Sequence, residues 1–206
     1  INGKKAGFWA SGYNAFNIDA TEYLNFDGSD NEIAVDLKNV EESSRWYPGG
    51  GLYRPVRLLL TGKCRFQPWE TFVRTVSVDA SKAVVSVSTK LLDHPKGTSV
   101  TAEILDANGN KVCDTYCSVK DGEINLPDLS VSHPKLWSPE TPYLYTLRLS
   151  ARKGNKKVLD SETTRFGIRT INVSKEGGFQ LNGVTRKIKG VCLHHDLGPL
   201  GAAENK

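Results

Sequence analysis

The stretch YLYTLRL, residues 143–149, decides the fold class. Every second position from Tyr143 to Leu149 is a tyrosine or a leucine, and Thr146 and Arg148 stand between them. Because successive side chains of a strand point to opposite faces, this spacing predicts a β-strand with one buried face and one exposed face.

The same alternation recurs along the chain, in residues 33–37, 85–88 and 100–104. Between such runs stand turn dipeptides: Asn108-Gly109, Asp121-Gly122, Gly154-Asn155 and Asn182-Gly183. Asn-Gly tolerates positive φ at both central positions, as a tight type I′ hairpin requires. We find no helical stripe over ten residues, so we predict an all-β protein of short antiparallel strands.

Glycine-containing breaks between predicted strands divide the sequence into three segments. Thr61-Gly62-Lys63 ends an apolar run at residues 56–60, and the short strands that follow continue to Phe166-Gly167. Residues 63–167 therefore have the size and strand spacing of an immunoglobulin-like β-sandwich. Residues 1–62 precede it, and residues 168–206 contain a hairpin and then the run KGVCLHHDLGPLGAA at 189–203, which reads as a buried parallel strand opening into a loop.

Composition excludes several classes of protein. The 206 residues carry a net charge of only +4 without a basic cluster, which argues against nucleic-acid binding. No apolar run approaches the roughly 18 residues of a membrane helix, so we expect no membrane span.

The chain has four cysteines. Cys113 and Cys117, four apart in a predicted strand, would have Cα atoms about 13 Å apart, too far for a disulfide. Free buried thiols are favoured over a zinc pair, and the compartment stays open between a periplasmic or secreted location and a bacterial cytoplasm. Asp79, Asp106 and Asp160 are expected at strand ends or turns, without a chemical role.

Two segments carry residue types suited to binding. SSRWYPGGGLYRPVR, residues 43–57, combines arginines and aromatics with three consecutive glycines. It could hold a ligand through Arg45 and Trp46, or it could pack between domains. At the other end of the chain, His194, His195 and Asp196 would follow the carboxyl end of the predicted strand at 189–193, which is where α/β barrels place their active sites.

Four stretches in order resemble glycoside hydrolase family 2, and within it the β-galactosidases. SRWYPGGGLYRPVRL is similar to the motif that ends the family's jelly-roll sugar-binding domain. LWSPETPYLYTLRL and FGIRT resemble the last strands of its immunoglobulin-like domain. FQLNGVTRKIKGVCLHHDLGPLGA resembles the start of its catalytic (β/α)₈ barrel.

The resemblance implies a domain for each segment: the end of the jelly roll (1–62), the sandwich (63–167) and the first barrel strand (168–206). It implies that His194 reaches substrate hydroxyls, with weaker roles for His195 and Asp196, and that Arg45 and Trp46 wall the cleft. It also implies a β-galactoside or oligosaccharide as substrate, Mg²⁺ or Na⁺ near the active site of some members, and a homo-oligomer as the assembly.

Family members hydrolyse with retention through two carboxyl groups about 5 Å apart. Both come from later barrel strands, so the resemblance implies that this chain lacks them, carries no catalytic residue or metal site of its own and is inactive alone. Asn31-Glu32 mimics the dipeptide of the family's acid/base residue, but it opens the alternating run at 33–37 and is rejected. The alternative is a stand-alone β-sandwich module that binds carbohydrate or serves in adhesion.

Overall fold

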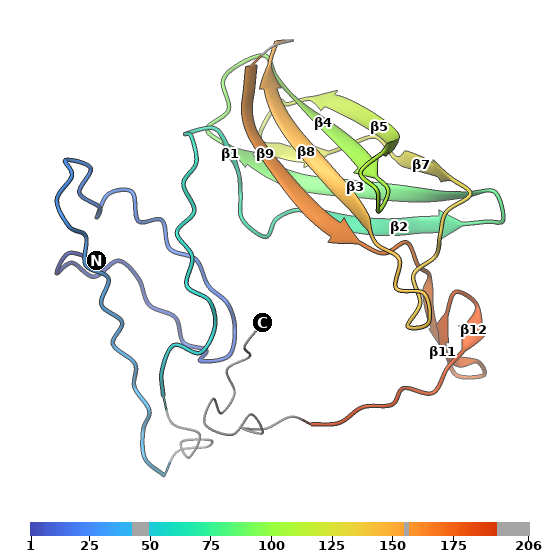
Figure 1. The fold of residues 1–206 in the computed structure, drawn as a ribbon, viewed down its shortest axis with the longest axis horizontal. Coiled ribbons are helices and arrows are strands. Elements are labelled where there is room, and N and C mark those ends of the chain that lie inside the picture. Colours follow the sequence, from blue (N-terminus) through green and yellow to red (C-terminus); the bar gives the residue numbers. More distant parts are fainter. Residues whose placement is uncertain (43–49, 155–156, 193–206) are drawn as a thin grey trace. The chain divides into compact units, whose positions relative to one another are not determined.

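The computed structural model describes residues 1–42, 50–154 and 157–192, which form strands, turns and extended segments without a helix (Figure 1). The chain divides into two compact units. The first comprises residues 1–58 together with the described residues from Gly190 onward, and the second comprises residues 59–189. All of the assigned strands lie in the second unit. The described residues contain no helix that could cross a membrane.

One sheet of the second unit is built around the long strand β3 (Lys82–Leu92). Its partners are β1 (Arg65–Phe66), β2 (Phe72–Val78), β6 (Glu123–Asn125) and β7 (Leu129–Ser132), all antiparallel. Val85 pairs with Thr75 of β2 and with Leu129 of β7, so β2 and β7 lie along opposite edges of β3.

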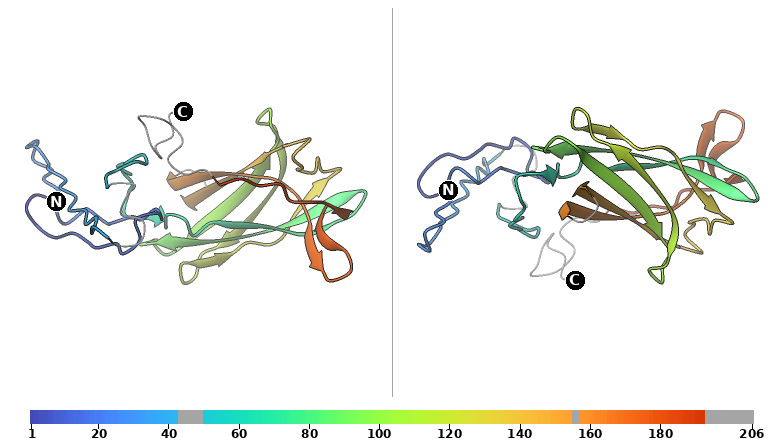
Figure 2. Two further views of the ribbon diagram at one scale, coloured as in Figure 1. Left: turned by 90° about the horizontal axis from the view of Figure 1, so that it is seen from below. Right: turned by 90° about the horizontal axis from the view of Figure 1, so that it is seen from above.

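The other sheet has the order β5-β4-β8-β9. These strands are β4 (Thr98–Leu105), β5 (Lys111–Ser118), β8 (Tyr145–Lys153) and β9 (Lys157–Phe166). The two sheets form separate layers and do not close into a barrel (Figure 2). The predicted β-sandwich is therefore confirmed.

The alternating runs of this unit bury the predicted faces. Val85, Val100, Ile104 and Leu147 are fully buried between the layers. Burying each such side chain contributes about 1.5–3 kcal/mol, so these inward positions supply much of the driving force for folding. The serines of β3 between the buried valines face outward and are partly exposed.

A small sheet follows the sandwich within the same unit. It consists of β10 (Ile171–Ser174), β11 (Gly178–Leu181) and β12 (Val184–Thr185) in the order β10-β11-β12. Its tight turn is Asn182-Gly183, with φ of 52° and 78°, so both central residues are left-handed, as predicted for a type I′ turn.

The Asn108-Gly109 turn differs from the prediction. Only Gly109 has positive φ, at 85°, and its N–H donates to the carbonyl oxygen of Asp106 at 3.0 Å. The Asp106 side chain also accepts from the N–H groups of Asn108 and Asn110. An aspartate that satisfies these donors favours a longer loop with one left-handed glycine over a two-residue I′ turn.

Three predicted strands are not formed among the described residues. Residues 33–37, 56–60 and 189–192 are extended but pair with no neighbouring strand. Ile33 and Val35, expected on a buried face, are 57% and 51% exposed. The alternation is present in the sequence, but a strand also needs a hydrogen-bonded neighbour and a layer to cover its apolar face.

Candidate functional site

The five residues predicted to contact substrate lie outside the described residues. Arg45 and Trp46 fall in residues 43–49, and His194, His195 and Asp196 fall in residues 193–206. Their predicted roles stay predictions.

The described end of the glycine-rich loop shows how it packs. A Cβ atom at Gly50 would lie 2.5 Å from Cδ2 of Leu37, so only glycine fits there without displacing the leucine. A few residues on, the Arg54 guanidinium lies 5.3 Å from the centroid of the Tyr53 ring, a cation–π contact. Gly50 thus permits a close approach within the first unit, whereas the run was predicted to pack between domains.

A junction joins the small sheet to the sandwich, and Asn182 is its centre. The Asn182 backbone N–H donates to the carbonyl oxygen of Thr170 at 2.9 Å, and its Oδ1 accepts from the Thr170 N–H at 3.0 Å. Its Nδ2 donates to the carbonyl oxygen of Trp137 at 3.0 Å. One side chain thus ties the hairpin turn to the linker after β9 and to the loop before β8.

Trp137 completes this junction. Its backbone N–H donates to the Ile168 carbonyl oxygen at 2.8 Å, and the Arg169 guanidinium lies 5.4 Å from its ring centroid. A Cβ at Gly167 would lie 2.6 Å from the Cβ of Trp137, so the glycine allows this approach.

An ion pair spans the same junction. The Arg186 Nη1 donates to Oε1 of Glu140 at 2.6 Å. This hydrogen bond lowers the pKa of Glu140 to about 2, so the pair stays charged over the physiological range. Together these contacts hold the small sheet against the loop that precedes β8.

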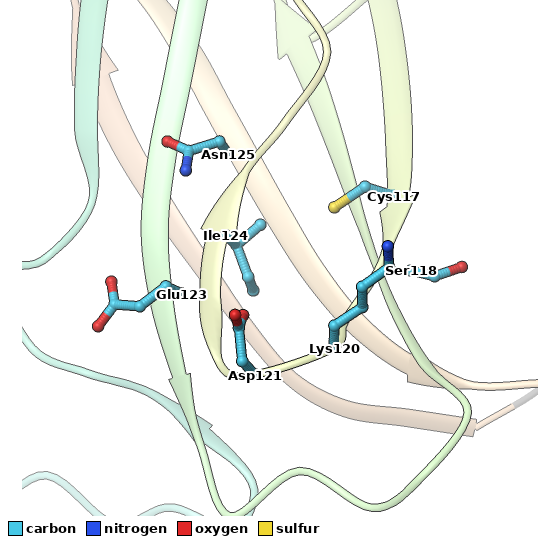
Figure 3. Close-up of a pocket in the computed structure, with 7 residues that line it drawn as sticks. All are labelled: Cys117, Ser118, Lys120, Asp121, Glu123, Ile124 and Asn125. Carbon is cyan, nitrogen blue, oxygen red and sulfur yellow. The ribbon is translucent and has the colours of Figure 1, made fainter.

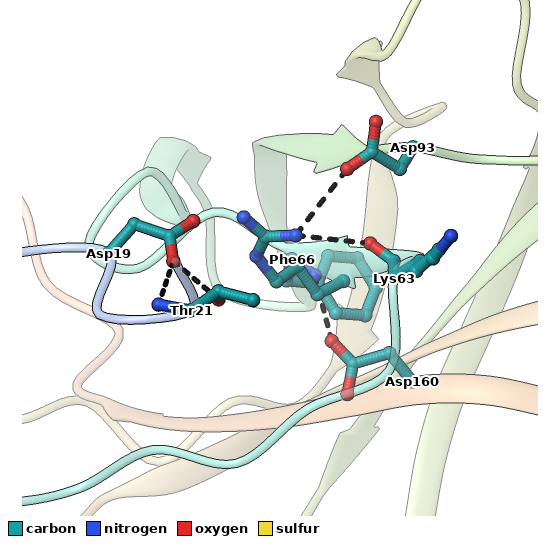
Figure 4. A network of polar contacts seen from close by, with 7 residues as sticks. Asp19, Thr21, Lys63, Phe66, Asp93 and Asp160 are labelled. Carbon is teal, nitrogen blue, oxygen red and sulfur yellow. Dashed lines mark hydrogen bonds and ion pairs between the residues drawn. The ribbon is translucent and has the colours of Figure 1, made fainter. Parts of the chain in front are cut away.

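Polar contacts also fix the first strand of the unit (Figure 4). The Arg65 Nη1 donates to the Lys63 carbonyl oxygen at 3.2 Å and to Oδ2 of Asp93 at 3.4 Å. The Phe66 N–H donates to Oδ2 of Asp160 at 2.8 Å. Because Asp160 belongs to β9, this bond joins strands of the two sheets.

Asp160 is expected from the sequence at a strand end, and that expectation is wrong. It lies within β9 opposite Ala151, and Glu162 lies opposite Leu149, so both carboxylates share a face with buried core residues. Sequence reasoning missed them because residues 160–165 of β9 are all polar, so no apolar alternation marks their inward face. The inward face of β9 could have been read from Phe166, because residues 160, 162 and 164 lie on the same face of the strand as Phe166.

Glu162 is held by a chain of hydroxyl groups. The Thr71 hydroxyl donates to Oε2 of Glu162 at 2.8 Å and lies 2.8 Å from the Thr89 hydroxyl, which therefore donates to Thr71. Burial raises the pKa of Glu162, the nearby charge of Asp160 adds to this, and the Thr71 hydrogen bond opposes it. A raised carboxyl pKa beside a second carboxylate could suggest an acid/base pair. Here, however, the two groups bond across the sandwich, which indicates that they hold its layers together.

A shallow pocket of about 120 Å³ lies at the β5–β6 turn (Figure 3). Lys120, Asp121 and Glu123 line it together with Cys117 of β5. Burial raises the pKa of the Cys117 thiol, and it raises that of Cys113 to about 11, so both remain protonated and weakly nucleophilic near neutral pH. All four cysteines are free. Cys113 and Cys117, expected to be buried, are half-buried, and Cys192 is exposed. Among the described residues no three His, Cys, Asp or Glu side chains cluster as metal ligands.

Comparison with known proteins places these features in a family. Residues 69–169 match the family Glycosyl hydrolases family 2. The whole chain is 42% identical to a β-galactosidase of Bacteroides ovatus, of which it covers 25%. It is also 40% identical over its full length to a putative β-glucuronidase of Formosa agariphila, of which it covers 20%.

Solved structures agree with this assignment. A β-glycosidase of Bacteroides vulgatus superposes with a TM-score of 0.71 at 32% identity, covering 79% of this chain and 21% of that protein. A glycosyl hydrolase family 2 member of Bacteroides cellulosilyticus gives a TM-score of 0.64 at 37% identity over 70% of this chain, and the match covers 19% of that protein. The chain spans about a quarter or less of the length of these relatives. On the family match, the relatives and the shared sandwich, this chain belongs to glycoside hydrolase family 2.

Proposed function

We propose that this chain is a non-catalytic N-terminal part of a retaining β-galactosidase, which hydrolyses terminal β-galactosides. The observation that carries the proposal is the 42% identity to a β-galactosidase over the whole chain. In this proposal the sandwich and its Asn182 junction position a catalytic barrel that begins near the end of the chain.

Retention needs a carboxyl acid/base and a carboxylate nucleophile about 5 Å apart, on either side of the scissile bond. Asp160 and Glu162, the adjacent inward carboxylates of β9, accept hydrogen bonds from Phe66 and Thr71 of the same sandwich. We therefore assign them a structural role and place the catalytic pair in the longer protein.

In the longer protein, His194 would contact substrate hydroxyls, because a neutral imidazole donates from one nitrogen and accepts at the other. His195 and Asp196 would support it, and Arg45 and Trp46 would wall the cleft. The described residues offer no cluster suited to the Mg²⁺ or Na⁺ that the family resemblance implies, so such an ion would be held by other residues. Assembly as a homo-oligomer is part of the same proposal.

The test of the fragment's role is a turnover assay of the purified 206-residue chain with an aryl β-galactoside. We expect no release of the aryl group above a blank preparation from cells lacking the chain. Sustained hydrolysis that copurifies with the chain would overturn the assignment of the catalytic carboxylates to other residues.

A β-glucuronidase is the second candidate, because a relative of almost equal identity carries that name. The longer enzyme should be assayed with matched aryl β-galactoside and aryl β-glucuronide. We expect the galactoside to be preferred in kcat/KM, and His194→Ala to lower that value, whereas preference for the glucuronide would transfer the proposal to the second activity.

A further inference from the structure

The segment between β1 and β2 makes a turn that its sequence does not favour. Gln67, Pro68, Trp69 and Glu70 form it, with the Glu70 N–H donating to the Gln67 carbonyl oxygen at 3.3 Å. Trp69 has φ of 67°. With proline second and a left-handed residue third, this is a type II turn, in which the third position favours glycine. A bulky side chain in that conformation costs about 1–2 kcal/mol.

Burial does not offset this cost. The Trp69 side chain is 65% exposed. Phe72, the first residue of β2, is 64% exposed. An unfavourable backbone conformation that presents an aromatic ring to solvent points to a function for the ring, since strained residues gather at binding sites.

The sheet surface beside these aromatics is polar and close to neutral. Phe72 pairs with Ser88 of β3, and Ser88 pairs on its other side with Asn125 of β6, so the three form one row across the outer face. The next row toward the end of β3 holds Lys90 and Glu123, whose charged groups pair at 3.0 Å. Small hydroxyl and amide side chains therefore lie beside an exposed ring. The charged side chains around them balance, since Lys90 and Arg74 are matched by Glu123 and Glu70.

On these observations we propose that Trp69, Phe72, Ser88 and Asn125 form a binding surface for a neutral glycan, which we call the outer-face platform. An aromatic ring stacks on the apolar C–H face of a pyranose, while hydroxyl and amide groups bond to the sugar hydroxyls. Trp69 and Phe72 are three residues apart, at most about 11 Å along the chain, so the platform suits an oligosaccharide of a few units.

The residues of these two rows favour a glycan over an apolar protein segment as the ligand. A protein helix would need a continuous apolar groove, whereas Ser88 and Asn125 interrupt the apolar surface beside Phe72. The pairing of Lys90 with Glu123 disfavours a polyanionic ligand. The platform does not depend on the proposed hydrolase, because it uses only residues of the sandwich.

The test is affinity electrophoresis of the 206-residue chain through gels containing β-galactan, xyloglucan or polygalacturonate, followed by calorimetry with the oligosaccharide of the polymer that retards it. We expect retardation by at least one of the two neutral polymers and none by polygalacturonate. Trp69→Gly is the decisive variant, because glycine suits the turn and should preserve or raise the melting temperature while it removes the ring.

We expect Trp69→Gly to weaken binding by at least about tenfold, equivalent to about 1.4 kcal/mol. Phe72→Ser gives a second variant at a position without the turn. Tyr116→Ala is the matched control, since Tyr116 is an exposed aromatic of β5 on the other sheet, and it should bind like the unaltered chain.

Three outcomes would overturn the platform: no retardation by either neutral polymer, unchanged binding by both Trp69→Gly and Phe72→Ser, or retardation by polygalacturonate alone. None of these outcomes bears on aryl-galactoside hydrolysis, so failure of the platform and failure of the proposed hydrolase are separate results.

Discussion

Glu162 is the residue whose environment differs most from what its type suggests. It lies on the core-facing side of β9, where it accepts a hydrogen bond from the Thr71 hydroxyl, and burial raises its pKa. A carboxyl group with a raised pKa in the folded state binds its proton more tightly there than in the unfolded chain. It therefore favours folding at pH values below its unfolded pKa, and this contribution is lost as pH rises through its folded pKa.

This predicts that Glu162→Gln stabilises the protein at neutral pH. The amide oxygen can still accept from Thr71, and no charge has to be buried. We expect the melting temperature to rise by roughly 1–3 °C at pH 7, corresponding to less than about 1 kcal/mol. The gain should shrink toward zero below pH 4.5, where the native carboxyl is protonated as well. Thermal unfolding of both proteins between pH 3.5 and pH 8 measures this.

Glu123→Gln is the matched control for the Glu162 series. Glu123 is exposed and pairs with Lys90 across the outer face of the other sheet, so its loss should change stability by at most a few tenths of a kcal/mol. A neutral or destabilising effect of Glu162→Gln at pH 7, with a gain only in acid, would contradict the predicted sign of the stability change.

At the scale of the element, the small sheet depends on one turn. Asn182-Gly183 is a two-residue I′ turn, and the asparagine side chain leaves the turn to bond the linker and the Trp137 loop. Asn182 thus combines a left-handed conformation, which asparagine tolerates better than most residues, with two side-chain hydrogen bonds outside its own hairpin.

We predict that Asn182→Ala costs about 2 kcal/mol, because it strands the Thr170 N–H and the Trp137 carbonyl oxygen and places alanine at positive φ. In hydrogen exchange, Asn182→Ala should exchange faster than the unaltered chain in β10 and β11, with little change in β4 and β8. Asn182→Gly separates the two contributions, because glycine accepts the positive φ and only the side-chain hydrogen bonds are lost.

Asn172→Ala is the control for this turn. It removes one exposed side-chain bond to Gln180 on the same small sheet, and it should cost less than about 0.5 kcal/mol. Equal losses for Asn172→Ala and Asn182→Ala would show that the junction contributes nothing beyond an ordinary surface contact.

The elements that could be predicted are those whose partners lie in the same unit. Alternation located β3, β4 and β8 because Val85, Val100 and Leu147 find an opposing layer within residues 59–189. The same pattern at 33–37 is equally clear in the sequence, yet no strand forms there. Period-two alternation reports that a segment could pair, whereas pairing depends on residues far away in sequence.

The candidate site could be predicted only as a resemblance. Arg45 and His194 follow from motif position alone, and both lie outside the described residues. The Asp160 and Glu162 bridge was missed because both core-facing positions are polar, so only their period-two spacing from Phe166 marks them as inward. Trp69 is visible in the sequence as an aromatic after a proline, but only its φ of 67° distinguishes it from an ordinary rim residue.

At the scale of the whole molecule, the two units differ in how they meet the cost of chain entropy. Ordering each residue costs roughly 1–2 kcal/mol of backbone entropy, which burial of apolar surface must offset. The second unit has a continuous buried core between two hydrogen-bonded sheets. In the first unit Phe8, Phe26 and Val56 are 79%, 74% and 71% exposed, and no strand ladder protects the described backbone.

We therefore predict that slow hydrogen exchange in the 206-residue chain is confined to the sandwich. Amides of β3, β4 and β8 should exchange only through global unfolding, whereas residues 1–42 should exchange through local opening with little free energy. Peptide-resolved exchange at pH 7 measures this. Added denaturant should bring the exchange rates of the sandwich amides to a common value and leave the exchange rates of residues 1–42 unchanged. Protection of residues 1–42 equal to that of β3 would contradict the prediction, because it would require the exposed phenylalanines to be covered. If self-association covers them, dilution of the sample should reverse the protection.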